Sequence, residues 1–118
     1  MFLAMADDIR AHANYIPYSP QKVRLVIDLV RGKDITEALD MLRFVQNGAA
    51  QPISKVLASA MANAEENFGV SRDDLFVYQI YANAAPSRRW RRFGARGRFK
   101  PIIRRASHIT VVLREREF

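Results

Sequence analysis

The sequence predicts an α+β fold: three helices packed on a small antiparallel β-sheet, with one long basic β-hairpin protruding from it. Two observations support the globular part. Apolar residues recur at helical spacing in three segments before residue 70, and they alternate with period two over 75–82 and 109–114. A third observation supports the hairpin, because the glycine-containing segment between the two alternating stretches lacks the apolar alternation of a core strand.

The first elements are predicted from local signals. Residues 9–16 alternate weakly and are expected to form a short strand. The first helix should begin at Ser19-Pro20, because a serine hydroxyl caps a free N–H and proline suits the first helical position. Gly32 should end this helix. Its apolar stripe consists of Val23, Val26, Ile27 and Val30.

Two more helices are expected. The shorter one should run from near Thr36 to a break at Asn47-Gly48. Its inward residues are Ala38, Leu39, Leu42 and Val45. The longer one should end at residues 67–69, and its start is open between Ala49, Ala50 and a first turn that contains Pro52. Its inward residues are Ile53, Val56, Leu57, Ala60, Met61, Ala64 and Phe68.

The two strands near the C-terminus frame the hairpin. In the first, one face should hold Leu75, Val77, Gln79 and Tyr81, and the other Phe76, Tyr78, Ile80 and Ala82. In the second, Ile109, Val111 and Leu113 share a face. We expect one domain over residues 1–118, with a globular body of about 9–82 plus 106–114 and a hairpin of about 83–105. Pro86 and Pro101 should interrupt the hairpin's pairing.

The charge is concentrated in one part of the chain. Residues 1–74 contain eight Lys or Arg and ten Asp or Glu, whereas residues 75–114 contain ten Lys or Arg and no acid. Solvated faces usually mix charge signs, because neighbouring like charges repel. The pattern therefore indicates a polyanionic partner, with nucleic acid preferred over an anionic membrane, since the basic segment has no apolar face.

Other function classes find little support. The chain has no cysteine, and its histidines, His12 and His108, are far apart in sequence, so neither a nucleophile–base pair nor a metal site is indicated. A helix-turn-helix is discounted because the second helix is acidic at its N-terminal end. The first eight residues lack the basic start of a signal peptide. We expect a cytoplasmic protein that is not an enzyme, with no cofactor, metal, membrane contact or homo-oligomer.

Aromatic residues lie among the arginines of the basic segment, and this combination favours RNA. Arginine pairs with phosphate bidentately and stacks on bases. Trp90, Phe93 and Phe99 can stack on unpaired bases, although packing within the hairpin explains each of them singly as well. The RNA-binding residues predicted here are Arg88, Arg89, Trp90, Arg91, Arg92, Arg96, Arg98 and Lys100.

Four segments resemble one known family, the bacterial large-subunit ribosomal protein L twenty-two family. They read SPQKVRLV at 19–26, ALDML at 38–42, KVLASAMANAE at 55–65 and RRASHITV at 104–111. The resemblance implies a ribosomal protein that binds large-subunit ribosomal RNA and helps assembly. It also implies neighbouring ribosomal proteins as partners, and a hairpin tip that lines the peptide exit tunnel and meets the nascent peptide. The alternative is a free-standing RNA-binding regulator of the same fold.

The resemblance also assigns residues. It adds to the RNA-binding set Gln21, Lys22, Arg24, Asn63, Arg104, Arg105, Ser107 and His108. It places the tunnel-lining tip at Arg88, Arg89, Trp90, Arg91, Arg92, Phe93 and Gly94. The chain departs from the family pattern near this tip, where Ala85 replaces a glycine, Phe93 a proline, Gly94 an arginine and Phe99 an alanine.

Overall fold

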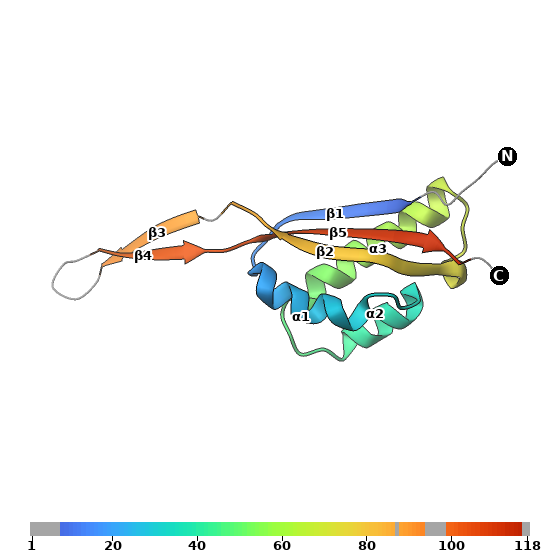
Figure 1. The fold of residues 1–118 in the computed structure, drawn as a ribbon, viewed down its shortest axis with the longest axis horizontal. Coiled ribbons are helices and arrows are strands. Elements are labelled where there is room, and N and C mark those ends of the chain that lie inside the picture. The colour runs from blue at the N-terminus through green and yellow to red at the C-terminus, as the bar shows by residue number, and fades with distance from the viewer. Residues whose placement is uncertain (1–7, 87, 94–98, 117–118) are drawn as a thin grey trace.

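The computed structural model describes the backbone of residues 8–86, 88–93 and 99–116, and the side chains of 8–86 and 105–116 (Figure 1). The elements are, in chain order, β1 (Ile9–Ile16), α1 (Pro20–Val30), α2 (Ile35–Arg43), α3 (Ala50–Asn67), the 3-10 turn η1 (Arg72–Asp74), β2 (Leu75–Ala84), β3 (Arg88–Phe93), β4 (Phe99–Arg104) and β5 (Ser107–Glu115). The predicted α+β class is confirmed.

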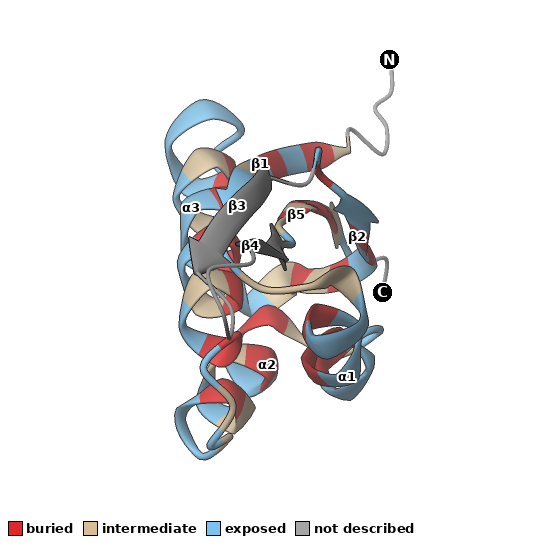
Figure 2. Ribbon diagram, turned by 90° about the vertical axis from the view of Figure 1, so that its left-hand side faces the viewer, coloured by how far each residue is buried: buried red, intermediate tan, exposed pale blue. Residues whose placement is uncertain are grey.

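The body is a three-stranded antiparallel sheet covered by helices on one face. The strand order is β1-β5-β2, so the last strand of the chain lies in the centre. α3 packs on β1 and β5, α1 packs on β2, and α2 packs mainly on α3. Figure 2 shows the helices gathered on one side of the sheet, with buried residues in the helices and in the strands of the sheet.

The start of α1 is confirmed in detail. Ser19 is the N-cap residue, and its hydroxyl accepts a 3.4 Å hydrogen bond from the backbone N–H of Lys22. Pro20 occupies the first helical position, where it leaves no N–H unpaired. The buried residues are the four predicted ones, Val23, Val26, Ile27 and Val30. Gly32, just beyond the helix, has a φ of 80°, a conformation that glycine adopts without steric cost.

The other two helices differ from expectation at their ends. α2 ends at Arg43, four residues before the predicted break at Asn47-Gly48. α3 begins at Ala50, with Pro52 in its first turn. Phe68 was predicted to face inward, and this was wrong: its side chain lies beyond the end of α3 and is 48% exposed. A period of 3.6 residues stops predicting burial where the helix itself stops.

The two faces of β2 are also corrected. Strict alternation placed Ile80 and Ala82 on one face of the strand and Leu75 and Val77 on the other, but all four are buried. The register of β2 against β5 shifts between Val77 and Gln79, which is the signature of a β-bulge. One extra residue reverses the alternation, so the later half of the strand turns its other set of side chains to the core.

The arm is the part of the hairpin formed by β3 and β4, which pair antiparallel with Phe93 opposite Phe99 (Figure 1). It gives the molecule extents of 69 × 30 × 19 Å. The expected break at Pro86 is observed, because β2 ends at Ala84 and β3 begins at Arg88. Pro101 differs, since it lies inside β4 opposite Arg91. A two-stranded ribbon consists of edge strands, where proline is tolerated.

Candidate nucleic-acid interface

The arm gathers most of the predicted basic residues into one ribbon. β3 contains Arg88, Arg89, Trp90, Arg91, Arg92 and Phe93, and β4 contains Lys100 and Arg104. The register places Arg88 opposite Arg104, and Arg92 opposite Lys100. Like charges directly opposite each other on antiparallel strands are destabilising, so a polyanion along the ribbon would relieve repulsion built into it. The predicted residues Gly94, Arg96 and Arg98 lie outside the described residues.

The root of the arm is the place where β2 ends at Ala84 and β5 begins at Ser107. Arg105, just before β5, is exposed. Ser107 is fully buried, and its hydroxyl donates a 2.7 Å hydrogen bond to the backbone carbonyl of Tyr18. Its burial leaves Ser107 no surface to offer a ligand, and its observed contact stabilises the domain.

His108, the next residue, turns to the other face of the sheet and is half-buried. The backbone N–H of Tyr15 donates a 3.1 Å hydrogen bond to His108 Nδ1. The two rings are perpendicular, with their centroids 4.7 Å apart. Tyr15 is 62% exposed and was not among the predicted residues. The weak alternation of residues 9–16 does not predict the contact between Tyr15 and His108, because this contact depends on an irregularity in the strand.

The predicted residues of α1 all lie on its exposed side. Gln21 and Lys22 are exposed in the first turn. Arg24 is exposed too, but its Nη2 donates a 2.9 Å hydrogen bond to the backbone carbonyl of Ala82 in β2. Arg31, which follows α1, donates in the same way to the carbonyl of Ile80 at 3.1 Å. These two arginines cover the outer edge of β2 around Ile80 and Ala82, where the described residues place no further strand; nearer its start, β2 is bridged at Phe76 to Asp34.

Asn63 is separated from the other predicted residues. It is half-buried near the C-terminal end of α3. Figure 1 shows this end of α3 at the side of the body away from the arm. The structure therefore brings together the residues of the arm and its root, and leaves Asn63 outside that group.

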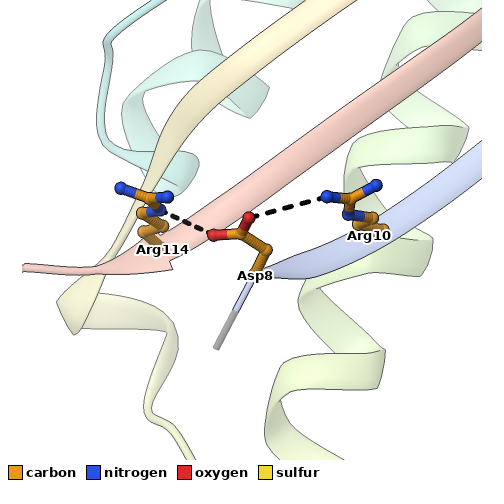
Figure 3. Close-up of polar contacts among 3 residues, drawn as sticks. All are labelled: Asp8, Arg10 and Arg114. Atoms are coloured by element: carbon orange, nitrogen blue, oxygen red, sulfur yellow. Dashed lines mark hydrogen bonds and ion pairs between the residues drawn. The ribbon is translucent and has the colours of Figure 1, made fainter. Parts of the chain in front are cut away.

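One basic residue of the acid-free segment has a partner within the body. Arg114 Nε donates a 2.6 Å hydrogen bond to Asp8 Oδ1, and Asp8 Oδ2 lies 3.7 Å from Arg10 Nη2 (Figure 3). The Arg114 hydrogen bond holds the pKa of the Asp8 carboxyl below its ordinary value. The same contact raises the pKa of the Arg114 guanidinium. Arg114 also lies over the ring of Tyr78, 3.5 Å from its centroid.

The rest of the described surface offers little chemistry. No group of three or more His, Cys, Asp or Glu side chains within residues 8–86 and 105–116 is arranged to hold a metal ion. A hollow of about 370 Å³ between the end of α2 and the start of α3 is lined by neutral side chains, among them Gln46, Asn47 and Gln51. In the described part of the chain, no helix is both long and apolar enough to cross a bilayer.

The sequence is similar to those of known proteins over most of its length. The family described as ribosomal protein L22p/L17e matches residues 11–114. The chain is 50% identical over 109 residues to the large ribosomal subunit protein uL22 of Finegoldia magna, covering 92% of this chain and 96% of the relative. It is 45% identical to that of Desulfitobacterium hafniense DCB-2 over 108 residues, which covers 92% of this chain and 95% of that relative. The protein of the same name from Dehalococcoides mccartyi strain 195 is 48% identical over 106 residues, or 90% of this chain and 97% of that relative.

These matches extend over nearly the whole chain and include the four segments quoted from the sequence. The matched proteins are ribosomal proteins, so the prediction that the chain is not an enzyme is confirmed. The chain belongs to the ribosomal protein L22p/L17e family.

Proposed function

We propose that this chain is a structural component of the large ribosomal subunit that binds large-subunit ribosomal RNA and helps the subunit assemble. The names of its relatives, which are large ribosomal subunit proteins, support the assignment to that subunit. The chain then acts in the ribosome, in the cytoplasm, as a single domain over residues 1–118. Its further partners are neighbouring ribosomal proteins.

The observation that supports RNA binding most directly is the arm. It combines an acid-free sequence with a register that sets basic residues opposite one another, as at Arg88 and Arg104. Such a ribbon is more stable with phosphates beside it than alone. A role within the protein's own core would require the opposite pattern, with apolar residues on one face of the strands.

The proposed interface leaves out two residues of the sequence prediction, Ser107 and Asn63, and Asn63 is omitted because it lies apart from the arm and its root. The interface consists of the arm, the exposed Arg105, half-buried His108, and the first turn of α1 with Gln21 and Lys22. Ser107 is left out, because its only described polar contact is internal. Arg24 is kept, since one hydrogen bond to Ala82 leaves further guanidinium N–H groups for a phosphate.

The tip of the arm is proposed to line the nascent-peptide tunnel. Support comes from shape: with its arm, the molecule is 69 Å long but only 30 and 19 Å across. Figure 1 shows β3 and β4 well clear of the helices. A ribbon of this kind can reach between RNA segments that the body cannot enter.

Binding of the chain to transcribed large-subunit ribosomal RNA at several salt concentrations tests the proposal. Nine of the ten basic residues in 75–114 remain for phosphate once Arg114 is assigned to Asp8. If all nine meet phosphates, the slope of log affinity against log salt should be about −6 to −8. An affinity that does not change with salt would refute RNA binding through the arm. A chain that binds RNA but never sediments with large subunits would instead indicate a free-standing regulator.

A further inference from the structure

We propose that Tyr15 and His108 form a stacking platform that holds one unpaired RNA base at the root of the arm. The inference rests on the proposed RNA-binding function and adds to it a site outside the basic segment. It is supported by the backbone of β1, by the contact between the two rings, and by the charges around them.

The backbone of β1 departs from regular strand geometry at Tyr15. The register of β1 against β5 shifts between Ala13 and Ile16, so a bulge interrupts the ladder there. Within it Tyr15 has a φ of 57°, the one positive value found among the described residues other than glycine. A bulky residue in this left-handed conformation is strained. Bulges often turn a side chain in a new direction, and strained residues are concentrated at binding sites.

Burial does not explain why a tyrosine occupies this strained position. The residue is 62% exposed, so much of its surface stays in water. The Tyr15 ring is nevertheless held in place, because it stands perpendicular to the ring of His108 at a centroid distance of 4.7 Å. An exposed aromatic ring that is fixed before binding loses little conformational freedom when a base stacks on it.

His108 contributes orientation and a donor. Its Nδ1 accepts the backbone N–H of Tyr15, so the ring proton lies on Nε2. An Nε2–H group beside the Tyr15 ring can donate to a base edge or to a phosphate oxygen. Asn83, which lies opposite His108 in β2, is exposed and adds an amide that can both donate and accept.

The charges around the platform suit RNA. Neither β1 nor the segments 80–86 and 105–111 contain an acidic residue. Arg105 is exposed two residues before Ser107, where the arm meets the body. A strand that follows the arm can therefore continue onto the platform without passing a negative charge, and its unpaired base can stack there while Arg105 faces its phosphate.

The test compares two RNA probes and four full-length variants. The probes are transcribed large-subunit ribosomal RNA, which has unpaired bases, and a fully paired RNA duplex. Tyr15→Asn removes the ring and keeps the backbone, because asparagine tolerates the left-handed conformation. Tyr15→Phe keeps the ring. Phe44→Leu is the matched control, since Phe44 is an 85% exposed aromatic residue at the end of α2. Tyr15→Gly repeats the first variant with the residue type that adopts this φ most easily.

Tyr15→Asn and Tyr15→Gly are expected to weaken binding to ribosomal RNA about ten-fold, the loss of one stacked base, and to leave duplex binding and the salt slope unchanged. Their melting temperatures should stay close to that of the wild type. Tyr15→Phe and Phe44→Leu should bind both probes like the wild type. Equal affinity of Tyr15→Asn and wild type for ribosomal RNA would overturn the platform alone. Equal weakening on both probes, or a Tyr15→Phe variant as weak as Tyr15→Asn, would overturn it too. A wild-type chain that binds neither RNA would overturn the proposed function itself.

Discussion

The hydroxyl of Ser107 donates a 2.7 Å hydrogen bond to the backbone carbonyl of Tyr18, and the Ser107 side chain is completely buried. This contact ties the segment before α1 to the root of the arm. It joins residues that are 89 positions apart in sequence. The family resemblance selected Ser107 as an RNA contact, whereas the structure gives it an internal partner.

Replacing this serine should therefore lower stability rather than RNA affinity. Ser107→Ala leaves the Tyr18 carbonyl without its partner, which costs about 1 to 3 kcal/mol. The melting temperature should fall by roughly 4 °C for each kcal/mol in a domain of this size. Ser59→Ala, on the exposed side of α3, is the control and should melt like the wild type. A Ser107→Ala variant of normal stability with weakened RNA binding would contradict the internal role.

Removing the charges of β3 should lower RNA affinity without lowering the stability of the domain. The variant with alanine at 88, 89, 91 and 92 should bind RNA more weakly, and its salt slope should become shallower by about 3. Its melting temperature should stay constant or rise slightly, because like charges no longer face each other across the ribbon.

A charge-matched control is available for that variant in the body. Alanine at Lys33, Arg43, Lys55 and Arg72 also removes four positive charges, and all four lie outside the acid-free segment. This control should keep most of the affinity. Equal losses in the two variants would show that net charge, and not the arm, determines binding.

Arg24 and Arg31 allow stability and RNA binding to be separated. Each donates to a carbonyl at the outer edge of β2, so alanine at either position should lower the free energy of unfolding by about 1 kcal/mol. Faster amide exchange in β2 should accompany the loss. Only Arg24→Ala should weaken RNA binding as well, because Arg24 lies beside Gln21 and Lys22 on α1. A similar RNA defect in both variants would mean that the edge of β2, rather than Arg24 itself, matters.

The Asp8 ion pair should make stability depend on pH. Its hydrogen bond with Arg114 holds the pKa of Asp8 below the ordinary value of 3.8. The folded state is thus favoured while the carboxylate is charged, and this stabilisation is lost as the pH falls through the lowered pKa. Asp8→Asn should be less stable than the wild type in urea unfolding at pH 7, and the two should converge in acid below pH 3.8. If the difference in stability between the two proteins stays constant down to pH 3.8 and below, lost packing and not the ion pair explains the lower stability of Asp8→Asn.

Local signals explain which parts of the fold were predictable. The start of α1 depends on two adjacent residues, Ser19 and Pro20. Its buried face follows from helical spacing alone, and consists of Val23, Val26, Ile27 and Val30. The faces of β2 were not predictable, because the bulge after Val77 arises from its pairing with β5. Phe68 was misassigned because α3 ends at Asn67, so helical spacing no longer determines the direction of the next side chain.

The interface was predictable in its charge and not in its contacts. The arm's arginines stand out in the sequence because no acid interrupts them. The sequence does not show that two other residues have partners inside the body. Arg114 pairs with Asp8, which is 106 residues away, and Ser107 donates to a backbone atom of Tyr18. Tyr15 gave no signal at all, since its exposed ring depends on a strained backbone conformation. Long-range pairing decides each of these cases.

The strand order of the body has a consequence for how the chain folds as it is made. β5 is the central strand and is synthesised after β1 and β2, which pair with β5 and not with each other. The sheet therefore cannot form until residues 107–115 have emerged, and by then the whole basic arm is already exposed. Folding of the sheet must therefore wait for β5, and such long-range pairing is slow. A chain truncated before Ser107 should stay unfolded, although it would contain all three helices.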